Sequence, residues 1–249
     1  MTEKKGKVCF MNKEIETLKQ LVADSNNIVF FGGAGVSTES GVPDFRSANG
    51  LYSQEFEYPP EVMLSHSFFI ENPDAFYDFY RNIMINEGIE PNPAHFALAE
   101  LEKANKLKAV ITQNIDGLHQ LAGSENVIEL HGSVHRNYCM TCGKHFGIEA
   151  IKVTGIPTCQ CGGIIRPDVV LYEEQLDSSL LSQAAECVSW ADMMIVGGTS
   201  LTVYPAAGFV HYYEGDKLVI INNSETHFDE RAALVIRDSI GKVLSSIGQ

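Results

Sequence analysis

The 249-residue sequence predicts an α/β fold in which an open parallel sheet carries helices on both faces. Short apolar runs rich in β-branched and aromatic residues predict buried strands at Ile28–Phe31, Ala109–Thr112, Met193–Val196, Leu218–Ile221 and, more weakly, Ala233–Ile236. Amphipathic stretches predict helices at Glu14–Ala23, Pro93–Ala104 and Ser178–Ser189. The alternation of strands with helices is typical of parallel strands joined by helical crossovers.

Composition and charge restrict the classes of function. No apolar run approaches the roughly 18–20 residues of a membrane helix, and no apolar segment follows the basic opening. We therefore expect no secretory signal and a cytoplasmic location. Lys and Arg number 18 against 32 Asp and Glu, a net charge of −14. Such a surface repels phosphate backbones, so we expect no direct nucleic-acid binding, whereas a basic protein partner would suit it.

Two regions interrupt the alternation of strands and helices. Residues from about 48 to 92 are rich in Phe, Tyr, Pro and Asn, and residues from about 134 to 164 hold a cysteine cluster with little apolar periodicity. We expect these insertions to form a smaller module beside the sheet. A cleft between two such modules is a natural ligand site.

A glycine-rich segment follows the first predicted strand, in IVFFGGAGVSTESGVPDFRS. Its glycines let the backbone pass close to a pyrophosphate at the start of a helix. The pattern is not a complete G-x-G-x-x-G, because Thr38 occupies the last position, and it lacks the lysine of a P-loop. Taken alone, it fits a tight turn as well as a nucleotide site. The GVPDFRS loop adds Asp44, Phe45 and Arg46, a charged and aromatic set that suits a ligand clamp.

Polar and small residues follow three further predicted strands, at the sheet edge where open α/β folds bind ligands. They are Gln113, Asn114 and Asp116 after the second strand, Gly198, Thr199 and Ser200 after the third, and Asn222 after the fourth. For Asn114 and Asp116, capping of the next helix is an equally good interpretation. Four polar strand ends on one rim are harder to explain by capping than any single one. We therefore expect a ligand site along this edge.

His131 ends the apolar run of VIELHGSV. Histidine exchanges protons near neutral pH, so His131 is the candidate general base. It is one of eight histidines, and a single histidine is more often structural than catalytic. The assignment therefore depends on its companions at the strand ends.

Four of the six cysteines crowd into YCMTCGKHFG…PTCQCGG: Cys139, Cys142, Cys159 and Cys161. Two pairs of thiolates followed by glycines suit a closed tetrahedral zinc site, which is structural and not catalytic. The second pair is C-x-C, one residue shorter than usual, so its loop must be tighter. An iron–sulfur cluster or free thiols are the alternatives.

Taken together, these motifs resemble the sirtuin family. GAGVS with GVPDFR, TQNID, the His–Gly pair, four cysteines, GTSL with PAA, and the Asn after LVII follow the family's order and spacing from about residue 12 onwards. The resemblance implies a Rossmann-like NAD-binding domain made of residues 12–47, 93–133 and 165–249. It also implies a zinc-ribbon module of residues 134–164, completed by a helical insertion of residues 48–92, with residues 1–11 as an N-terminal extension.

The resemblance further implies an NAD-consuming protein-lysine deacetylase with a structural zinc, acting on acetylated-lysine proteins. His131 matches the catalytic base, with Asn114 and Asp116 orienting ribose and substrate. The positions implied to bind NAD, together with Asp44 and Gly198 from the motifs above, are Ala34, Thr38, Asp44, Phe45, Arg46, Gln113, Ile115, Asp116, His131, Gly198, Thr199, Ser200, Asn222 and Ile240. Val169, Val170 and Leu171 match the strand that pairs with the substrate peptide.

Some positions depart from the family pattern. Gly32 stands where Thr is common, and Glu173 where Gly is frequent. An ADP-ribosyltransferase and a non-catalytic NAD sensor are the competing functions. His131 favours deacylation over the transferase, which needs no base on the ribose hydroxyl, and the full set of polar strand ends argues against the sensor.

The helical insertion bears on the acyl group that is removed. Sirtuins that prefer succinyl or malonyl lysine carry a Tyr and, three residues on, an Arg. Here the third residue after Tyr80 is Ile83, and Arg81 directly follows Tyr80, about 100° away on a helix. The sequence therefore predicts a preference for acetyl and other uncharged acyl groups. A shifted alignment or a loop movement that brings Arg81 inward is the alternative.

Overall fold

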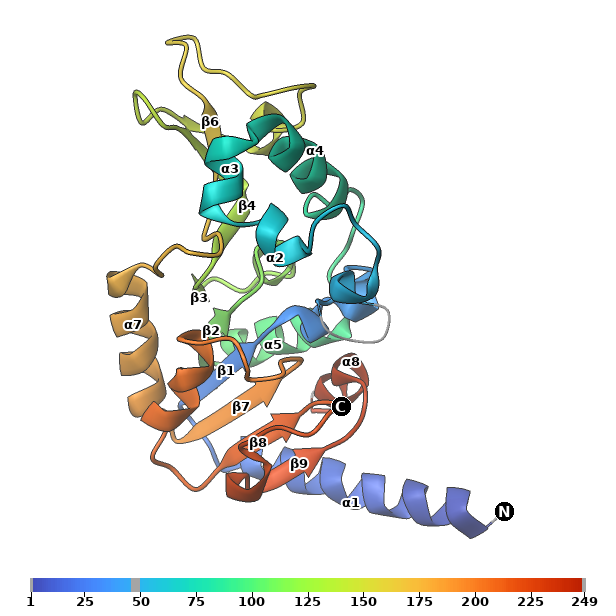
Figure 1. The fold of residues 1–249 in the computed structure, drawn as a ribbon. Coiled ribbons are helices and arrows are strands. Elements are labelled where there is room, and N and C mark those ends of the chain that lie inside the picture. The colour runs from blue at the N-terminus through green and yellow to red at the C-terminus, as the bar shows by residue number, and fades with distance from the viewer. Residues whose placement is uncertain (1, 46–49, 248–249) are drawn as a thin grey trace.

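The computed structural model describes residues 2–45 and 50–247, with side chains from residue 13 onwards, and contains one six-stranded and one three-stranded sheet (Figure 1). In spatial order the six strands are β3 (Val127–Glu129), β2 (Leu107–Thr112), β1 (Ile28–Gly32), β7 (Met193–Gly197), β8 (Leu218–Ile221) and β9 (Leu234–Ile236). Every pairing is parallel. The predicted α/β class is confirmed, and only β3 was not among the predicted strands.

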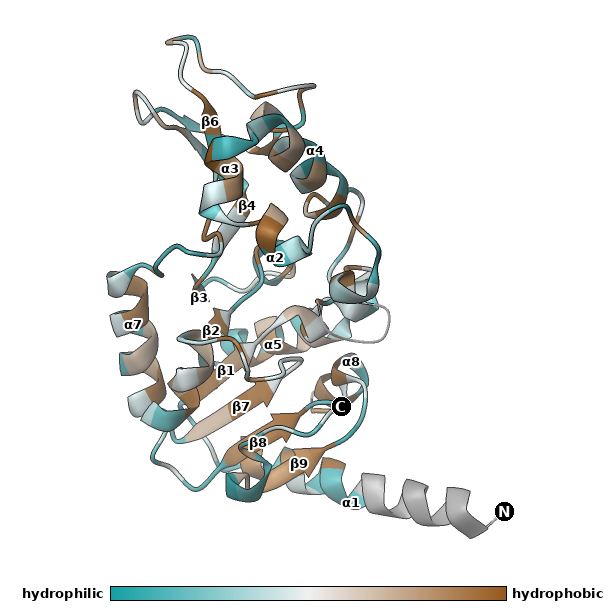
Figure 2. Cartoon of the chain, in the orientation of Figure 1, coloured by the Kyte–Doolittle hydropathy of each residue, from teal (hydrophilic) through white to brown (hydrophobic). Residues whose placement is uncertain are grey.

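Helices cover both faces of this sheet. On one face lie α1 (Thr2–Ala23), α5 (Pro93–Lys103) and α8 (Ile240–Ser245), and on the other α7 (Ser178–Ser189) and the 3-10 helix Ala206–Tyr212. Successive strand residues alternate between these layers: Phe30 packs with the first set and Phe31 with the second. Strands β1, β7 and β8 contain no polar side chain, as their colours in Figure 2 indicate, because both of their faces are buried.

Local sequence signals fix the starts of two of these helices. The Asn92 side chain accepts a hydrogen bond from the Ala94 amide at 2.9 Å, and Pro93 occupies the first turn of α5. Asp177 caps α7 in the same way, accepting from the amides of the second and third residues beyond it. Among the described residues, no helix combines the length and apolarity needed to cross a bilayer.

The smaller module packs helices α2 (Pro60–Met63), α3 (His66–Glu71) and α4 (Pro73–Ile83) against a sheet of β5 (His145–Phe146), β4 (Gly132–Cys139) and β6 (Ile165–Val169). Short helices elsewhere are α6 (Leu118–Leu121) and the 3-10 turns Ala34–Val36, Thr38–Ser40, Leu51–Ser53, Ile148–Ala150 and Asp229–Arg231. Stacked and edge-on aromatic rings, including Phe69, Phe76 and Tyr80, fill the core of the module. The module lies above the large sheet in Figure 1.

Strand β6 bears on the predicted division of the chain. It pairs antiparallel with β4, and Ile165 and Val169 are buried in the core of the smaller module. The predicted domain limits stay predictions. This pairing favours ending the zinc-ribbon module after residue 169, and not after residue 164 as predicted.

The strand order determines where the sheet can bind a ligand. The chain runs outward from β1 through β2 to β3, then crosses back to β7 and continues to β9. The order therefore reverses between β1 and β7, whose carboxyl ends lie side by side at Gly32 and Gly197. Open α/β sheets bind ligands at such a reversal, because the loops after the two strands diverge there.

Gly32, at the end of β1, stands where relatives of this pattern often carry threonine. A Cβ atom added at Gly32 would lie 2.5 Å from Cε1 of the fully buried Phe30 ring. The aromatic ring therefore occupies the space that a side chain at position 32 would need. This steric conflict accounts for the glycine.

We expect Gly32→Thr to lower the free energy of unfolding by about 1–3 kcal/mol, as overpacking of a buried site does. Phe30→Leu should destabilise separately by leaving a void. The double variant should lose less than the sum of the two, because the shorter leucine makes room for the threonine. Urea denaturation of the four proteins measures this coupling, and strictly additive losses would contradict the steric explanation.

Candidate active site and metal centre

A cleft of about 630 Å³ opens between the carboxyl edge of the large sheet and the smaller module. It brings together residues that lie far apart in the sequence. The predicted site residues that line it are Ala34, Thr38, Asp44, Phe45, Gln113, Asn114, Ile115, Asp116, His131, Val169, Val170, Leu171, Gly198, Thr199, Ser200, Asn222 and Ile240. The remaining predicted residue, Arg46, lies outside the described residues.

The floor of the cleft is a contact between two backbones. The Gly35 amide donates to the Gly198 carbonyl at 2.8 Å, and a Cβ atom on Gly35 would lie 2.8 Å from the Gly198 Cα. Gly198 has a φ of 59°, which glycine adopts without strain. The turns after β1 and β7 can therefore approach closely only because glycines occupy both positions.

A hydrogen-bonded network connects the turn after β1 to the segment after β2. The hydroxyl of the fully buried Ser37 donates to Oδ2 of Asp116 at 2.7 Å and accepts from the Asn114 amide group at 3.0 Å. The Asn92 side chain anchors the same turn by donating to the Val36 carbonyl at 2.7 Å. This network fixes the orientation of Asn114 and Asp116 in the cleft.

The capping interpretation is confirmed for Asp116, and its role in a ligand site stays a prediction. Its Oδ1 accepts from the Leu118 amide at 2.9 Å at the start of α6, which is a capping contact. Its Oδ2 faces Ser37 in the cleft. Burial raises the pKa of Asp116 above its ordinary value, opposed by these two hydrogen bonds. Asn114 is no cap, because its side chain donates to Ser37.

His131 lies in the turn between β3 and β4 and is half-buried. Its Nδ1 lies 2.9 Å from the Gln113 carbonyl, which can only accept, so Nδ1 carries the proton and Nε2 has the free lone pair. Burial lowers the pKa of His131, partly offset by the bond to Gln113. The ring is therefore neutral at pH 7, as a general base requires.

The rim beyond β7 and β8 carries the remaining predicted polar groups. Gln113 donates from its amide nitrogen to the Thr199 hydroxyl at 3.1 Å, which links the loops after β2 and β7. The Ser200 hydroxyl lies 2.8 Å from that of Thr202, and the Asn222 amide donates to the Ser224 carbonyl at 3.0 Å. These contacts orient polar side chains along one edge of the cleft.

The opposite wall is the segment Val169–Leu171. The Val170 amide donates to the His131 carbonyl at 3.0 Å, so this segment is attached to the backbone of the candidate base. The Leu171 amide donates to Glu174 Oε2 at 2.9 Å, and Glu174 also pairs with Arg166 at 2.5 Å. The wall is therefore held in place on both sides.

One end of the cleft lies against α4. It is lined by Tyr80 and Ile83 of that helix and by Met84 and Asn86 after it, and none of these side chains carries a charge. Arg81 points elsewhere, since its guanidinium donates to the Gly155 carbonyl at 2.9 Å and pairs with Asp78 at 2.6 Å. The alternative in which Arg81 turns into the cleft is therefore wrong for this structure.

Sequence reasoning missed several residues of the cleft. Ser37 lay within the GAGVS motif but was not assigned a role, although a small hydroxyl beside a glycine turn was the available signal. Glu39 was also missed: its Oε1 accepts from the Ser239 hydroxyl at 2.8 Å and the Gly241 amide at 2.9 Å. Glu39 thereby connects the turn after β1 to the start of α8, next to Ile240.

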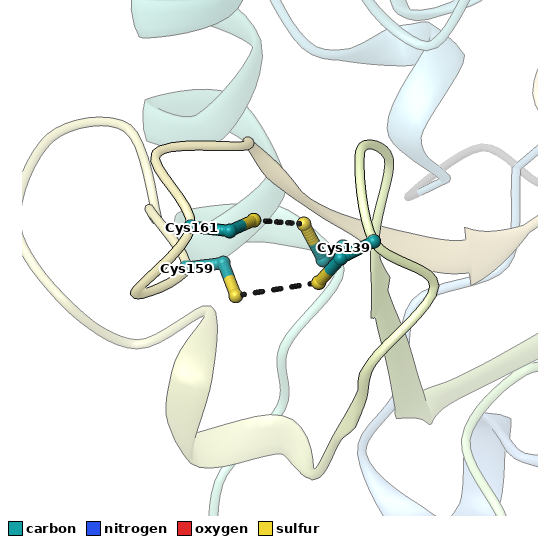
Figure 3. Close-up of side chains that lie close together, drawn as sticks. Cys139, Cys159 and Cys161 are labelled. Atoms are coloured by element: carbon teal, nitrogen blue, oxygen red, sulfur yellow. Dashed lines mark hydrogen bonds between the residues drawn. The ribbon is translucent and has the colours of Figure 1, made fainter.

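The four predicted cysteines form one cluster in the smaller module. Their sulfur atoms lie within 4.8 Å of one another and face each other in Figure 3. The Cys139 and Cys161 sulfurs are 3.4 Å apart, and those of Cys142 and Cys159 are 3.8 Å apart. A tetrahedral zinc with Zn–S bonds of about 2.3 Å requires sulfurs roughly 3.8 Å apart. The donor set and its dimensions therefore fit a structural zinc ion.

Glycines make the short C-x-C loop possible. Gly162 has a φ of 85°, and Gly143 in the other loop has a φ of 70°. A Cβ atom on Gly163 would lie 2.7 Å from the Cys139 sulfur. Only glycine fits so close to the cluster.

We expect one zinc ion per chain, and Cys139→Ser should lose it and destabilise the smaller module, because closed thiolate sites contribute folding free energy. Elemental analysis and thermal unfolding measure the two effects. Cys187→Ser is the matched control, since Cys187 lies on α7 away from the cluster. Iron in place of zinc, or no metal in freshly purified protein, would contradict the assignment.

Comparison with known proteins gives a consistent result. A sequence profile of the Sir2 family matches residues 33–205. A protein of Clostridium acetobutylicum named NAD-dependent protein deacetylase is 60% identical over 239 residues, covering 94% of this chain and 98% of the relative. A solved structure of Sir2 with a p53 peptide and NAD+ matches with a TM-score of 0.81 and 40% identity, covering 92% of this chain and 95% of that one.

A second solved structure, of Sir2 with a deacetylated p53 peptide and 3′-O-acetyl ADP ribose, matches with a TM-score of 0.85 and 40% identity. It covers 94% of this chain and 96% of that chain. Both the fold and the sequence agree along nearly the whole length. The chain belongs to the Sir2 family, the sirtuins.

Proposed function

We propose that this protein is an NAD-dependent protein-lysine deacetylase that removes acetyl and other uncharged acyl groups and produces nicotinamide and O-acyl-ADP-ribose. The observation that carries the proposal is a neutral histidine, His131, with a free Nε2 in a cleft that also holds Asn114 and Asp116. Relatives of 60% identity carry the name of this activity. The substrates are proteins with acetylated lysines.

Different residues of the cleft would have different roles in the reaction. Bound NAD would supply the glycosidic bond to nicotinamide and the ribose hydroxyl that takes up the acyl group. Asn114 and Asp116, oriented by Ser37, would hold the ribose and the acyl-lysine in reacting geometry. His131 Nε2 would accept the proton of the ribose hydroxyl. The carboxylate of Asp116 would also stabilise positive charge that develops on the sugar.

The cellular setting belongs to the same proposal. A cluster of four thiolates needs reduced cysteines, which favours the cytoplasm over an oxidising compartment. The net charge of −14 favours basic protein segments over nucleic acid as partners. Extraction of the protein with the cytosolic fraction of cells tests the first of these statements.

Incubation with NAD and an acetyl-lysine peptide should release nicotinamide and deacetylated peptide in equal amounts. His131→Ala should fold normally and lose at least about a hundredfold in kcat, within the usual contribution of a general base. Because the pKa of His131 is lowered, the active neutral form should persist down to pH values below its ordinary 6.5 and be lost only further down. A folded His131→Ala that keeps most of its turnover would refute the role, and NAD-dependent labelling of the peptide by ADP-ribose would favour a transferase instead.

The uncharged end of the cleft beside α4 predicts which acyl groups are accepted. A succinyl carboxylate there would lose its water without gaining a cation, since Arg81 is held by Gly155 and Asp78. We expect kcat/KM for acetyl-lysine to exceed that for succinyl-lysine by at least about tenfold on matched peptides. Ile83→Arg, which places a guanidinium three residues after Tyr80, should narrow this ratio. Equal rates on the two peptides with the unaltered protein would contradict the prediction.

A further inference from the structure

Glu173 has an unusual backbone at the wall of the cleft. Its φ is 74°, in the left-handed region, where a glycine would be unstrained and a glutamate is not. The residue lies two positions after Leu171, lines the cleft and is exposed. This chain therefore carries a negative charge at a backbone position that favours glycine.

The carboxylate of Glu173 is held in one place. Its Oε2 accepts from both the amide and the hydroxyl of Ser67 at the start of α3, at 2.9 and 2.6 Å. These two bonds lower the pKa of Glu173, so the group is charged at neutral pH. Holding the carboxylate against α3 also offsets the backbone strain.

Glu173 has no lysine or arginine partner among the described residues, and the only cationic group that helps to lower its pKa is His66. Within residues 13–45 and 50–247, no Lys or Arg forms an ion pair with it, and neither bond from Ser67 uses Oε1. The nearby cation Arg166 is bound to Glu174. Glu173 therefore places an exposed negative charge at the wall of the cleft, beside the segment expected to pair with the peptide.

We infer that Glu173 is a specificity-determining residue that selects protein substrates with a Lys or Arg in the segment flanking the acyl-lysine. The inference rests on the proposed deacetylase function. A peptide paired with Val169–Leu171 would run as an extended strand, and residues two apart on it lie about 7 Å from each other. A long basic side chain next to or near the acyl-lysine can therefore reach Glu173, and an acidic one would be repelled.

The expected size of this selectivity follows from the solvent exposure of the ion pair between Glu173 and a basic peptide residue. Exposed ion pairs change an equilibrium by a few-fold, so an Arg-flanked peptide should gain about threefold in kcat/KM over a neutral one, and a Glu-flanked peptide should lose about as much. The ratio between the two charged peptides is then about tenfold. It should appear in KM and not in kcat, because Glu173 does not touch the reacting atoms, and it should shrink as salt is raised.

The experiment measures kcat/KM on acetyl-lysine peptides that differ only in flanking Arg, Gln or Glu, with the position of the charge scanned across both flanks. Glu173→Gln keeps the shape and removes the charge, and Glu173→Lys inverts it. Glu186→Gln on α7 is the matched control, because it removes the same charge from an exposed site away from the cleft. If Glu173→Gln does not fold, Glu173→Gly serves instead, since glycine adopts this φ freely.

We expect the Arg-to-Glu ratio to fall at least about threefold in Glu173→Gln, to reverse in Glu173→Lys and to stay nearly constant in Glu186→Gln. A ratio that is the same in Glu173→Gln as in the unaltered protein would overturn the inference. Equal turnover of all three peptides by the unaltered protein would overturn it while leaving the deacetylase function intact. No turnover of any peptide would instead overturn the proposed function, and the inference with it.

Discussion

The approach of Gly35 to Gly198 is the contact on which the cleft depends. Strands β1 and β7 end side by side where the strand order reverses, and the turns after them meet through the bond from the Gly35 amide to the Gly198 carbonyl. Any side chain on Gly35 would separate the two turns. Because these turns form the floor of the cleft, their spacing determines where every polar strand end around it lies.

Buried hydrogen bonds extend this constraint toward the reacting groups. Asn92 holds the Val36 carbonyl, the next residue is Ser37, and Ser37 holds both Asn114 and Asp116. Each of these side chains has a hydrogen-bond partner, so the network orients them without the free-energy cost of an unpaired buried polar group. Burial of Asp116 raises its pKa, and the hydrogen bonds from Leu118 and Ser37 oppose that rise without cancelling it.

The sequence predicted the large sheet better than the smaller module, for physical reasons. Strands buried on both faces are continuous apolar runs, whereas β6 (Ile165–Val169) alternates buried with half-buried residues around Arg166, Pro167 and Asp168 and gives no such run. Strand β3 was missed because it has only three residues. Strand-end residues such as Gln113 could be predicted, since parallel strands bring their carboxyl ends to one edge. Leu64 lines the cleft through tertiary packing of the smaller module, which no local pattern reveals.

The position of His131 connects the two sides of the cleft. Its ring is held by the Gln113 carbonyl after β2, and its own carbonyl accepts from the Val170 amide in the wall provided by the smaller module. The base is therefore fixed to the sheet that would hold the nucleotide and to the segment that would hold the peptide. Movement of the smaller module would displace Val170 and the His131 backbone together. Proton transfer by His131 and placement of the peptide are thus connected through one backbone hydrogen bond, from the Val170 amide to the His131 carbonyl.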